Sequence, residues 1–163
     1  MNIILTGFMG SGKTTFGRKL ARRSGFTFLD MDAEIEVQAG MPIVDIFSTY
    51  GEAYFRDLEH AFLQSLSKKQ NLVLSTGGGI VLNPDNMAIL KQCGTIVFLS
   101  PPPEVLLERL SGDTTRPVIA GKTPAEILDL YHQRLPYYQQ YADMILDGGA
   151  QSMEQLLQYM KEH

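Results

Sequence analysis

A glycine-rich segment near the N-terminus constrains the fold of this chain more than any other feature of its sequence. Residues 7–14, GFMGSGKT, match the pattern G-x-x-x-x-G-K-[ST] at every fixed position. A short apolar run at residues 2–6 precedes the segment, and a stretch with helical spacing follows it. Glycines let the backbone approach a ligand closely, so successive N–H groups can point at one anion, and the next helix adds the positive end of its dipole. The segment therefore predicts a strand, a phosphate-binding loop and a helix, in that order.

Two side chains of this segment carry groups that suit a bound polyphosphate. The Lys13 ammonium can reach the outer phosphates, and the Thr14 hydroxyl is a suitable ligand for Mg²⁺. The other interpretation is a glycine-rich turn that happens to contain a lysine. A guanine-specific GTPase would also need an Asn-Lys-x-Asp segment, which does not occur in the sequence. The loop alone does not separate a kinase from a nucleotide-binding module without catalysis.

Short apolar runs alternate with longer stretches of helical spacing along the rest of the chain. Besides residues 2–6, strands are predicted at residues 27–31, 72–76 and 95–100, and a shorter run at 144–146 has a weaker pattern. The nearly continuous apolar runs indicate burial on both faces, and the helices between them indicate crossover connections. The predicted fold class is therefore α/β, a parallel sheet covered by helices.

Several helix boundaries can be predicted from capping residues. Asn83 and Thr123 each precede a proline, and Glu126 completes a capping box with Thr123. Ser100, followed by three prolines, is expected to cap the helix EVLLERL in the same way. Residues 152–162 have the apolar spacing of one helix face, which is expected to pack on the sheet.

Composition limits the classes of protein to which the chain can belong. Its 163 residues are enough for one domain with a buried core. A content of 44% hydrophobic and 20% charged residues excludes disordered and collagen-like chains, and a net charge of -4 argues against broad nucleic-acid binding. Because no apolar run approaches the roughly 18 residues of a membrane span and no basic-then-apolar leader occurs, we expect a cytoplasmic protein. The single cysteine, Cys93, is expected to be a small core residue.

Two aspartates follow the second predicted strand, where open parallel sheets bind their ligands. Asp30 and Asp32 stand at its carboxyl end with one residue between them. Such a pair could hold Mg²⁺ through water or accept a proton from a substrate hydroxyl. The alternative is that Asp32 only caps the next helix.

An arginine and three glycines add to this picture. Arg56 has Glu52 four residues before it and Glu59 three residues after it, a spacing that by itself is typical of a surface ion-pair cluster. The third predicted strand ends in three consecutive glycines, residues 77–79. Three glycines are entropically costly for a simple turn, but they are explained if backbone N–H groups must come close to a ligand.

Segments along almost the whole chain, taken together, resemble the shikimate kinase family. In chain order they are GFMGSGKTT, FLDMDAEIE, GEAYFRDLE, STGGGIV, TTRPVIAG and YHQRLPYY. The resemblance implies a single-domain phosphate-loop kinase over residues 1–163, related to the nucleoside monophosphate kinases, with a five-stranded parallel sheet between helices. The implied reaction transfers the γ-phosphoryl group of ATP to the 3-hydroxyl of shikimate, with Mg²⁺, on the route to aromatic amino acids.

The resemblance also implies roles for individual residues. The catalytic residues would be Lys13, Asp32, which accepts the proton of the attacking hydroxyl, and Arg116. Shikimate would be bound by Asp32, Arg56, Gly77, Gly78, Gly79 and Arg134, with the two arginines gripping its carboxylate. ATP would be bound by Gly10, Ser11, Gly12, Lys13, Thr14, Thr15, Arg109 and Arg116, with Arg109 against the adenine. The metal would be held by Thr14 and, through water, by Asp30.

Larger regions and partners follow from the same resemblance. The acceptor would bind around residues 30–60, where Glu59 would hold the Arg56 guanidinium in place. Residues 111–122, which are polar and poor in helical pattern, are either an ordinary surface loop or the lid that closes over the phosphates. The expected partners are the small molecules shikimate and ATP, with no nucleic acid and no membrane, and the chain is expected to be a monomer.

Some positions depart from the family or leave alternatives open. Residues 147–151 lack the basic residue that many relatives carry there, so contacts with the base would come from the backbone or Gln151. Tyr137 and Tyr138, on a helix expected to end near Pro136, either line the acceptor site or only pack.

The remaining alternatives concern the histidines and the reaction itself. His60, His132 and His163 match no catalytic position and are expected on helix surfaces or in packing. Two other functions stay open: a related kinase of another small hydroxy acid such as gluconate, or of a nucleotide, and a non-catalytic ATP-sensing module.

Overall fold

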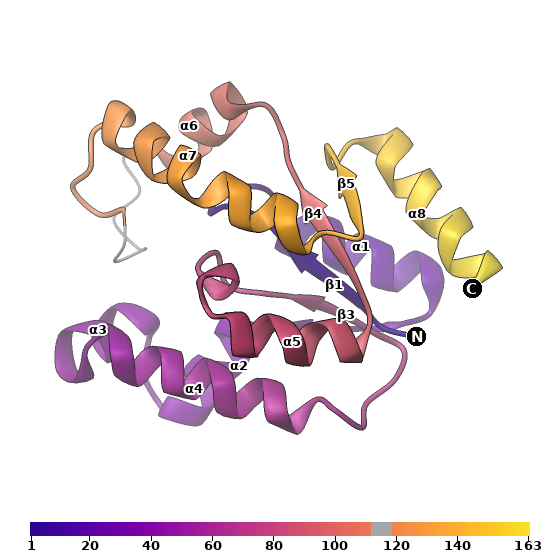
Figure 1. Cartoon of the computed structure of the whole chain (residues 1–163), viewed down its shortest axis with the longest axis horizontal. Helices are drawn as coiled ribbons and strands as arrows, with labels where there is room; N and C mark the ends of the chain where they lie inside the picture. The colour runs from indigo at the N-terminus through magenta and orange to yellow at the C-terminus, as the bar shows by residue number, and fades with distance from the viewer. Residues whose placement is uncertain (112–118) are drawn as a thin grey trace.

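The computed structural model describes residues 1–111 and 119–163, which form a five-stranded parallel sheet with helices on both faces (Figure 1). The strand order is β2-β3-β1-β4-β5. The strands are β1 (Ile3–Thr6), β2 (Thr27–Asp30), β3 (Leu72–Ser75), β4 (Thr95–Leu99) and β5 (Met144–Leu146). The helices are α1 (Lys13–Ser24), α2 (Met31–Ala39), α3 (Ile43–Tyr50), α4 (Glu52–Ser65), the short 3₁₀ helix η1 (Ile80–Leu82), α5 (Pro84–Cys93), α6 (Pro103–Leu110), α7 (Pro124–Tyr141) and α8 (Ala150–Glu162).

The central strand β1 divides the core into two apolar clusters. Its side chains alternate between the faces of the sheet, as the two-residue period of a strand requires. Ile3 and Leu5 belong to the cluster that contains Leu20 of α1 and Leu156 of α8, whereas Ile4 belongs to the other cluster. Helices α5 and α7 pack on that second face (Figure 1). The two-sided burial predicted from the continuous apolar runs is therefore confirmed.

Most predicted boundaries agree with the structure. Each predicted strand agrees to within one residue at either end. Asn83 caps α5 by accepting hydrogen bonds from two backbone amides, and Thr123 and Glu126 form the predicted capping box of α7. Cys93 is half-buried and packs against the larger cluster, as expected for a small core residue.

The expected role of Ser100 as a helix cap is wrong. Helix α6 begins at Pro103, and Pro102 stands at its N-cap position with no side-chain cap. Ser100 lies too early in the chain, and its amide instead donates to the Leu146 carbonyl (2.7 Å) beside β5. Ser100 thus continues the pairing of β4 with β5, as its place in the predicted strand 95–100 suggests, and does not serve as a helix cap.

The expectation that a helix ends near Pro136 is also wrong. Helix α7 continues through this proline to Tyr141. A proline inside a helix removes a hydrogen bond and costs stability. Arg134 and Tyr138 are buried on either side of Pro136, so tertiary packing holds the helix through it.

Helices α2, α3 and α4 lie together beyond the carboxyl end of β2 (Figure 1). They pack against one another and form one side of the region where the strands end. Within residues 1–111 and 119–163, no helix combines the length and the apolar character needed to cross a membrane.

Replacing Gly94 by Ala is expected to destabilise the fold by about 2–3 kcal/mol, as at other overpacked sites. Gly94 joins α5 to β4, and a Cβ there would overlap the main-chain carbonyl of Asn2. Asn2 cannot move away readily, because its side chain bonds to Lys69, Leu72 and Cys93 of three neighbouring segments. Urea denaturation measures the change in the free energy of unfolding.

A matched substitution tests whether crowding is the cause of that loss. Gly25 ends α1 with φ 79°, and a Cβ on this residue would have nothing within 4 Å. Gly25→Ala therefore adds only backbone strain, about 1 kcal/mol. Equal losses in the two variants would contradict the explanation for Gly94.

Candidate active site

The glycine-rich segment forms a tight loop between β1 and α1. Gly10 and Gly12 have φ 78° and 89°, the left-handed region that favours glycine. The Ser11 amide closes the loop by donating to the Phe8 carbonyl (3.1 Å). The Lys13 ammonium donates to the carbonyls of Gly7 (2.7 Å) and Phe8 (3.2 Å), so the lysine lies back along the loop.

The first turn of α1 faces the same loop. Gly12 is its N-cap and provides no side-chain cap, and the first intrahelical amide donor is Phe16, which bonds to the Gly12 carbonyl (2.9 Å). The amides of the preceding helical residues therefore have no intrahelical acceptor. Amides of this kind and the helix dipole suit the binding of an anion.

Asp30 and Asp32 have different positions at the end of β2. Asp30 caps α2, because its Oδ1 accepts from the amides of Asp32 (3.1 Å) and Ala33 (3.3 Å). The alternative that Asp32 is only a helix cap is therefore wrong. The second Asp30 oxygen accepts from the Thr14 hydroxyl (3.3 Å), which brings the two predicted metal-binding residues together.

A cavity of about 710 Å³ extends from this loop to the start of α8. We call it the loop pocket. Its lining includes the predicted nucleotide-binding residues Gly10, Ser11, Gly12, Lys13, Thr14, Thr15 and Arg109, both aspartates, and residues 147–150. Arg109 reaches over the loop and donates to the Gly10 carbonyl (2.8 Å). Asp147 accepts from the amide of Gly149 and the hydroxyl of Ser152, which fixes the turn on the far wall.

A second cavity, of about 570 Å³, adjoins the first. We call it the arginine pocket, because Arg56 and Arg134 line it together with Asp32, Glu59 and Gly77, Gly78 and Gly79. Its apolar wall, which the sequence did not indicate, consists of Pro42, Ile43, Val44, Phe47 and Phe55. Met9, Asp32 and Gly78 line both cavities, so Asp32 stands at their junction.

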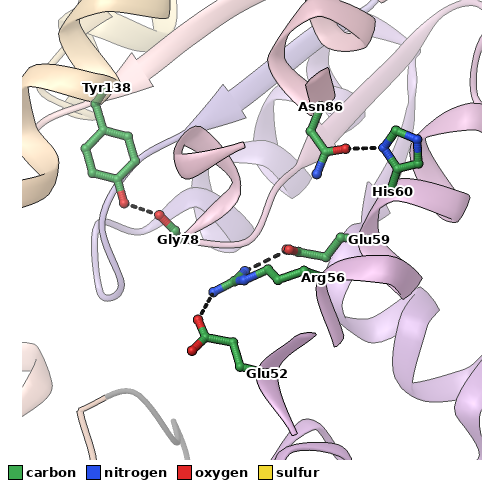
Figure 2. A network of polar contacts seen from close by, with 7 residues as sticks. All are labelled: Glu52, Arg56, Glu59, His60, Gly78, Asn86 and Tyr138. Atoms are coloured by element: carbon green, nitrogen blue, oxygen red, sulfur yellow. Dashed lines mark hydrogen bonds and ion pairs between the residues drawn. The ribbon is translucent and has the colours of Figure 1, made fainter. Parts of the chain in front are cut away.

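Arg56 is held by two glutamates of its own helix, α4 (Figure 2). Its guanidinium donates to Glu59 (2.7 Å) and Glu52 (3.1 Å). The interpretation as a surface ion-pair cluster is wrong for Glu59, whose side chain is 0% exposed. Because a buried carboxylate needs a partner, Glu59 fixes the position of Arg56 rather than merely shielding a surface charge.

Two of the three glycines after β3, Gly77 and Gly79, have no room for a Cβ without a shift of their neighbours. A Cβ on Gly79 would lie 2.6 Å from Arg56 Nη2. A Cβ on Gly77 would lie 2.9 Å from Glu59 Oε2 and 3.0 Å from Asp32 Oδ1. Among the described residues, the amides of residues 77–79 donate to no group, so these N–H donors are available to a ligand.

Asp32 and Glu59 place two carboxylates next to Gly77. Asp32 Oδ1 and Glu59 Oε2 are buried and have no hydrogen-bond partner in the described part of the chain. Burial and then the charge of Asp30 raise the pKa of Asp32 from its ordinary 3.8 to about 6. Burial raises the pKa of Glu59 to about 7, although Arg56 opposes this shift. Both carboxyl groups therefore hold a proton more tightly than an exposed carboxyl group does.

Arg134 is a buried cation on α7 and is only 5% exposed. Its Nε has no hydrogen-bond partner, and no carboxylate oxygen lies within 4.0 Å of its nitrogens in the part of the chain that the structure describes. The guanidinium carbon lies 6.0 Å from the centre of the Phe8 ring. A buried guanidinium without a carboxylate partner is suited to binding an anion from outside the chain.

The two tyrosines after Arg134 differ. Tyr137 is 44% exposed, whereas Tyr138 is fully buried and donates a hydrogen bond to the Gly78 carbonyl (Figure 2). Sequence reasoning missed this contact, and the only signal for it was the four-residue spacing from Arg134, which puts both side chains on one helix face.

The histidines have no part in either pocket. His60 bonds to Asn86 between α4 and α5 (Figure 2), His132 packs beside Tyr131, and His163 stacks on Tyr159. These positions confirm the expected packing and surface roles. Arg116 and most of the predicted lid lie outside the described residues.

Comparisons with known proteins agree on one family. The family model for shikimate kinase matches residues 9–163. A shikimate kinase of Nitrosomonas europaea is 46% identical over 96% of this chain and 75% of its own length. One of Caldanaerobacter subterraneus is 43% identical over 95% of this chain and 91% of its own. Among solved structures, the shikimate kinase of Acinetobacter baumannii in complex with shikimate is 39% identical, with a TM-score of 0.88 over 99% of this chain and 90% of that one.

Replacing Asp32 by Asn is expected to stabilise the protein more at pH 8 than at pH 5. The folded state holds the Asp32 proton more tightly than the unfolded state does, so stability falls as the pH rises from about 4 through the folded pKa of about 6. Below that pH range Asp32 is protonated in both the folded and the unfolded state, so no stability is lost. One pKa unit corresponds to about 1.4 kcal/mol, so the gain at pH 8 is at most about 3 kcal/mol.

Thermal unfolding of both proteins between pH 4.5 and 8, without ligands, measures this effect. The difference in Tm between Asp32→Asn and the unmodified chain should grow with pH. A difference that stays constant over this range would contradict the raised pKa of Asp32.

Proposed function

Since the chain belongs to the shikimate kinase family, and is thus an ATP-dependent kinase that phosphorylates shikimate, we propose that its two adjoining pockets divide the two substrates between them. The loop pocket takes ATP and the arginine pocket takes shikimate. The observation that carries this proposal is the position of Asp32, which lines both pockets at their junction. A phosphoryl group and a hydroxyl must meet at such a point for transfer to occur.

The ATP phosphates bind at the glycine-rich loop. The backbone amides at the start of α1 and the dipole of that helix face the phosphates, and Lys13 supplies a cation on the same side. The adenine lies toward the far wall, between Arg109 and residues 147–150. Because residues 147–151 contain no basic side chain, the base contacts on that wall come from backbone groups or Gln151.

Thr14 and Asp30 are the residues that would hold Mg²⁺. Their oxygens lie 3.3 Å apart, so one ion, or a water bound to it, can contact both. In residues 1–111 and 119–163 no group of three metal-binding side chains occurs, which suits an ion that takes its remaining ligands from phosphates and water. When bound, Mg²⁺ neutralises charge on the phosphates.

Shikimate binds by its carboxylate between Arg56 and Arg134. Both guanidinium groups line the same pocket, and planar forks of this kind match a carboxylate in geometry and charge. The apolar wall with Phe47 and Phe55 receives the carbon ring. Glu59 keeps Arg56 in place, so the carboxylate meets a prepositioned cation.

Asp32 orients the attacking hydroxyl and accepts its proton. The free, buried Asp32 oxygen is available to a hydroxyl donor, and its raised pKa of about 6 makes the carboxylate a better proton acceptor than an exposed aspartate. The transition state is loose, so most of the catalytic effect comes from positioning and from charge stabilisation by Lys13. Arg116, which is outside the described residues, is proposed as a second cation over the transferred group, in a lid formed by residues 111–122.

The chain is also proposed to act as a monomer in the cytoplasm. Sedimentation of the purified protein tests this point.

ADP release with Mg·ATP and a panel of acceptors tests the substrate assignment. Shikimate is expected to give a far higher kcat/KM than gluconate or a nucleoside monophosphate, because only shikimate combines the carboxylate with a compact ring. Faster turnover of gluconate would overturn the assignment of the arginine pocket. ATP hydrolysis that no acceptor stimulates would instead favour the non-catalytic ATP-sensing alternative.

Replacing Arg134 by Lys is expected to raise the KM for shikimate by roughly 30-fold, the cost of about 2 kcal/mol that is typical when a buried charge loses its matched partner. The KM for ATP should change little, because Arg134 does not line the loop pocket. Steady-state kinetics with each substrate varied in turn gives both constants.

A surface arginine provides the control for this substitution. Arg23 pairs with Glu154 between α1 and α8, with the Arg23 side chain 42% exposed. Arg23→Lys should leave both KM values unchanged. If Arg134→Lys also leaves the KM for shikimate unchanged, Arg134 does not bind the carboxylate.

A further inference from the structure

Tyr138 is tied to the glycine segment although it contacts neither pocket directly. Its hydroxyl donates to the Gly78 carbonyl, and its ring stacks on Phe98 of β4 with centroids 5.1 Å apart and planes at 19°. Neither cavity has Tyr138 in its lining, whereas Gly78 lines both. Tyr138 therefore contacts the glycine segment from outside the two cavities.

The hydrogen bond from Tyr138 affects the arginine pocket through the orientation of one peptide, the one between Gly78 and Gly79. The peptide between Gly78 and Gly79 is trans, so the Gly78 carbonyl and the Gly79 amide point in opposite directions. Figure 2 shows Tyr138 on one side of Gly78 and Arg56 on the other. With its carbonyl bonded to Tyr138, the trans peptide turns the Gly79 N–H away from Tyr138. The Arg56 guanidinium lies close to the same residue, because a Cβ on Gly79 would be 2.6 Å from Nη2.

A peptide flanked by glycines needs such a support. Glycine rotates about its backbone bonds more freely than other residues, so without the Tyr138 hydroxyl the N–H can turn away at little steric cost. Among the described residues, the Gly79 amide has no acceptor that would hold it from the other side.

We propose that Tyr138 is a positioning residue that orients the Gly78–Gly79 peptide, so that the Gly79 N–H and the Arg56 guanidinium converge on the acceptor carboxylate. This inference rests on the proposed role of the arginine pocket. Tyr138 lines neither pocket, and its hydroxyl interacts with the Arg134 side chain as well as with this peptide.

Burial and stacking on Phe98 hold the Tyr138 side chain in place. The side chain is fully buried, and burial raises the pKa of its hydroxyl well above the ordinary value, so the group remains a hydrogen-bond donor. Tyr138 lies four residues after Arg134 on α7, so one helix face carries both the second cation of the pocket and the support of the glycine peptide. Helix α7 thereby sets two separate contacts with the same carboxylate.

Tyr138→Phe tests the proposal, because it removes the hydroxyl and keeps the ring on Phe98. The KM for shikimate should rise roughly 10-fold, the size of one hydrogen bond to a charged group. The KM for ATP and kcat should stay within about twofold. Tyr159→Phe is the matched control, because it removes a hydroxyl that bonds to Thr95 (3.2 Å) between α8 and β4, and it should change neither KM.

The possible outcomes separate positioning from packing. A lower Tm with an unchanged KM for shikimate would show that Tyr138 is only structural, and equal rises in both KM values would show general disruption of the site; either result overturns the proposal. If Tyr138→Phe does not fold, Phe98→Leu is the second variant. It removes the ring on which Tyr138 stacks and keeps the Tyr138 hydroxyl. A smaller but equally selective rise in the KM for shikimate is then expected, and its absence overturns the proposal.

Arg134→Lys, measured beside these variants, separates two kinds of failure. If it raises the KM for shikimate while Tyr138→Phe does not, only the role of Tyr138 fails. If neither variant changes this KM, the assignment of the arginine pocket to the acceptor fails as well.

Discussion

The carboxyl ends of three neighbouring parallel strands meet at one edge of the sheet, and the whole site depends on that meeting. Strand β1 runs into the glycine-rich loop, β2 into Asp30 and Asp32, and β3 into the glycines of residues 77–79. In an open parallel sheet these ends form the natural place for a ligand. The hydrogen-bonded registry of the strands thus fixes the distance between groups that lie up to about 70 residues apart in the chain.

Features tied to a strand end or a helix start could be predicted from the sequence. The glycine-rich loop follows from its spacing, and the α/β class follows from the alternation of apolar runs and helical stretches. The sequence predicts both aspartates at the correct strand end, but the only helix cap it suggests there is Asp32, whereas the N-cap of α2 is Asp30. Only the structure shows that Asp30 bonds to the amides, which leaves an oxygen of Asp32 free at the junction of the pockets.

Features that depend on tertiary packing could not be predicted in this way. The spacing of Arg56 and Glu59 is the same on a surface helix as on a buried one, so sequence does not reveal that Glu59 is enclosed. The bond from Tyr138 to Gly78 joins segments 60 residues apart and depends on where α7 lies. Local propensity also failed at Pro136, because buried neighbours on both sides hold the helix together. The roles of these residues come from their neighbours in space.

The crowding around residues 77–79 has a consequence for inhibition of this enzyme. A side chain on Gly77 or Gly79 would crowd groups that are proposed to serve the acceptor: Asp32 and Glu59 in one case, Arg56 in the other. A resistance mutation at either position would therefore damage the pocket it has to preserve. On the proposed roles of these groups, an inhibitor anchored to the backbone amides of residues 77–79 would bind a surface that is costly for the enzyme to alter.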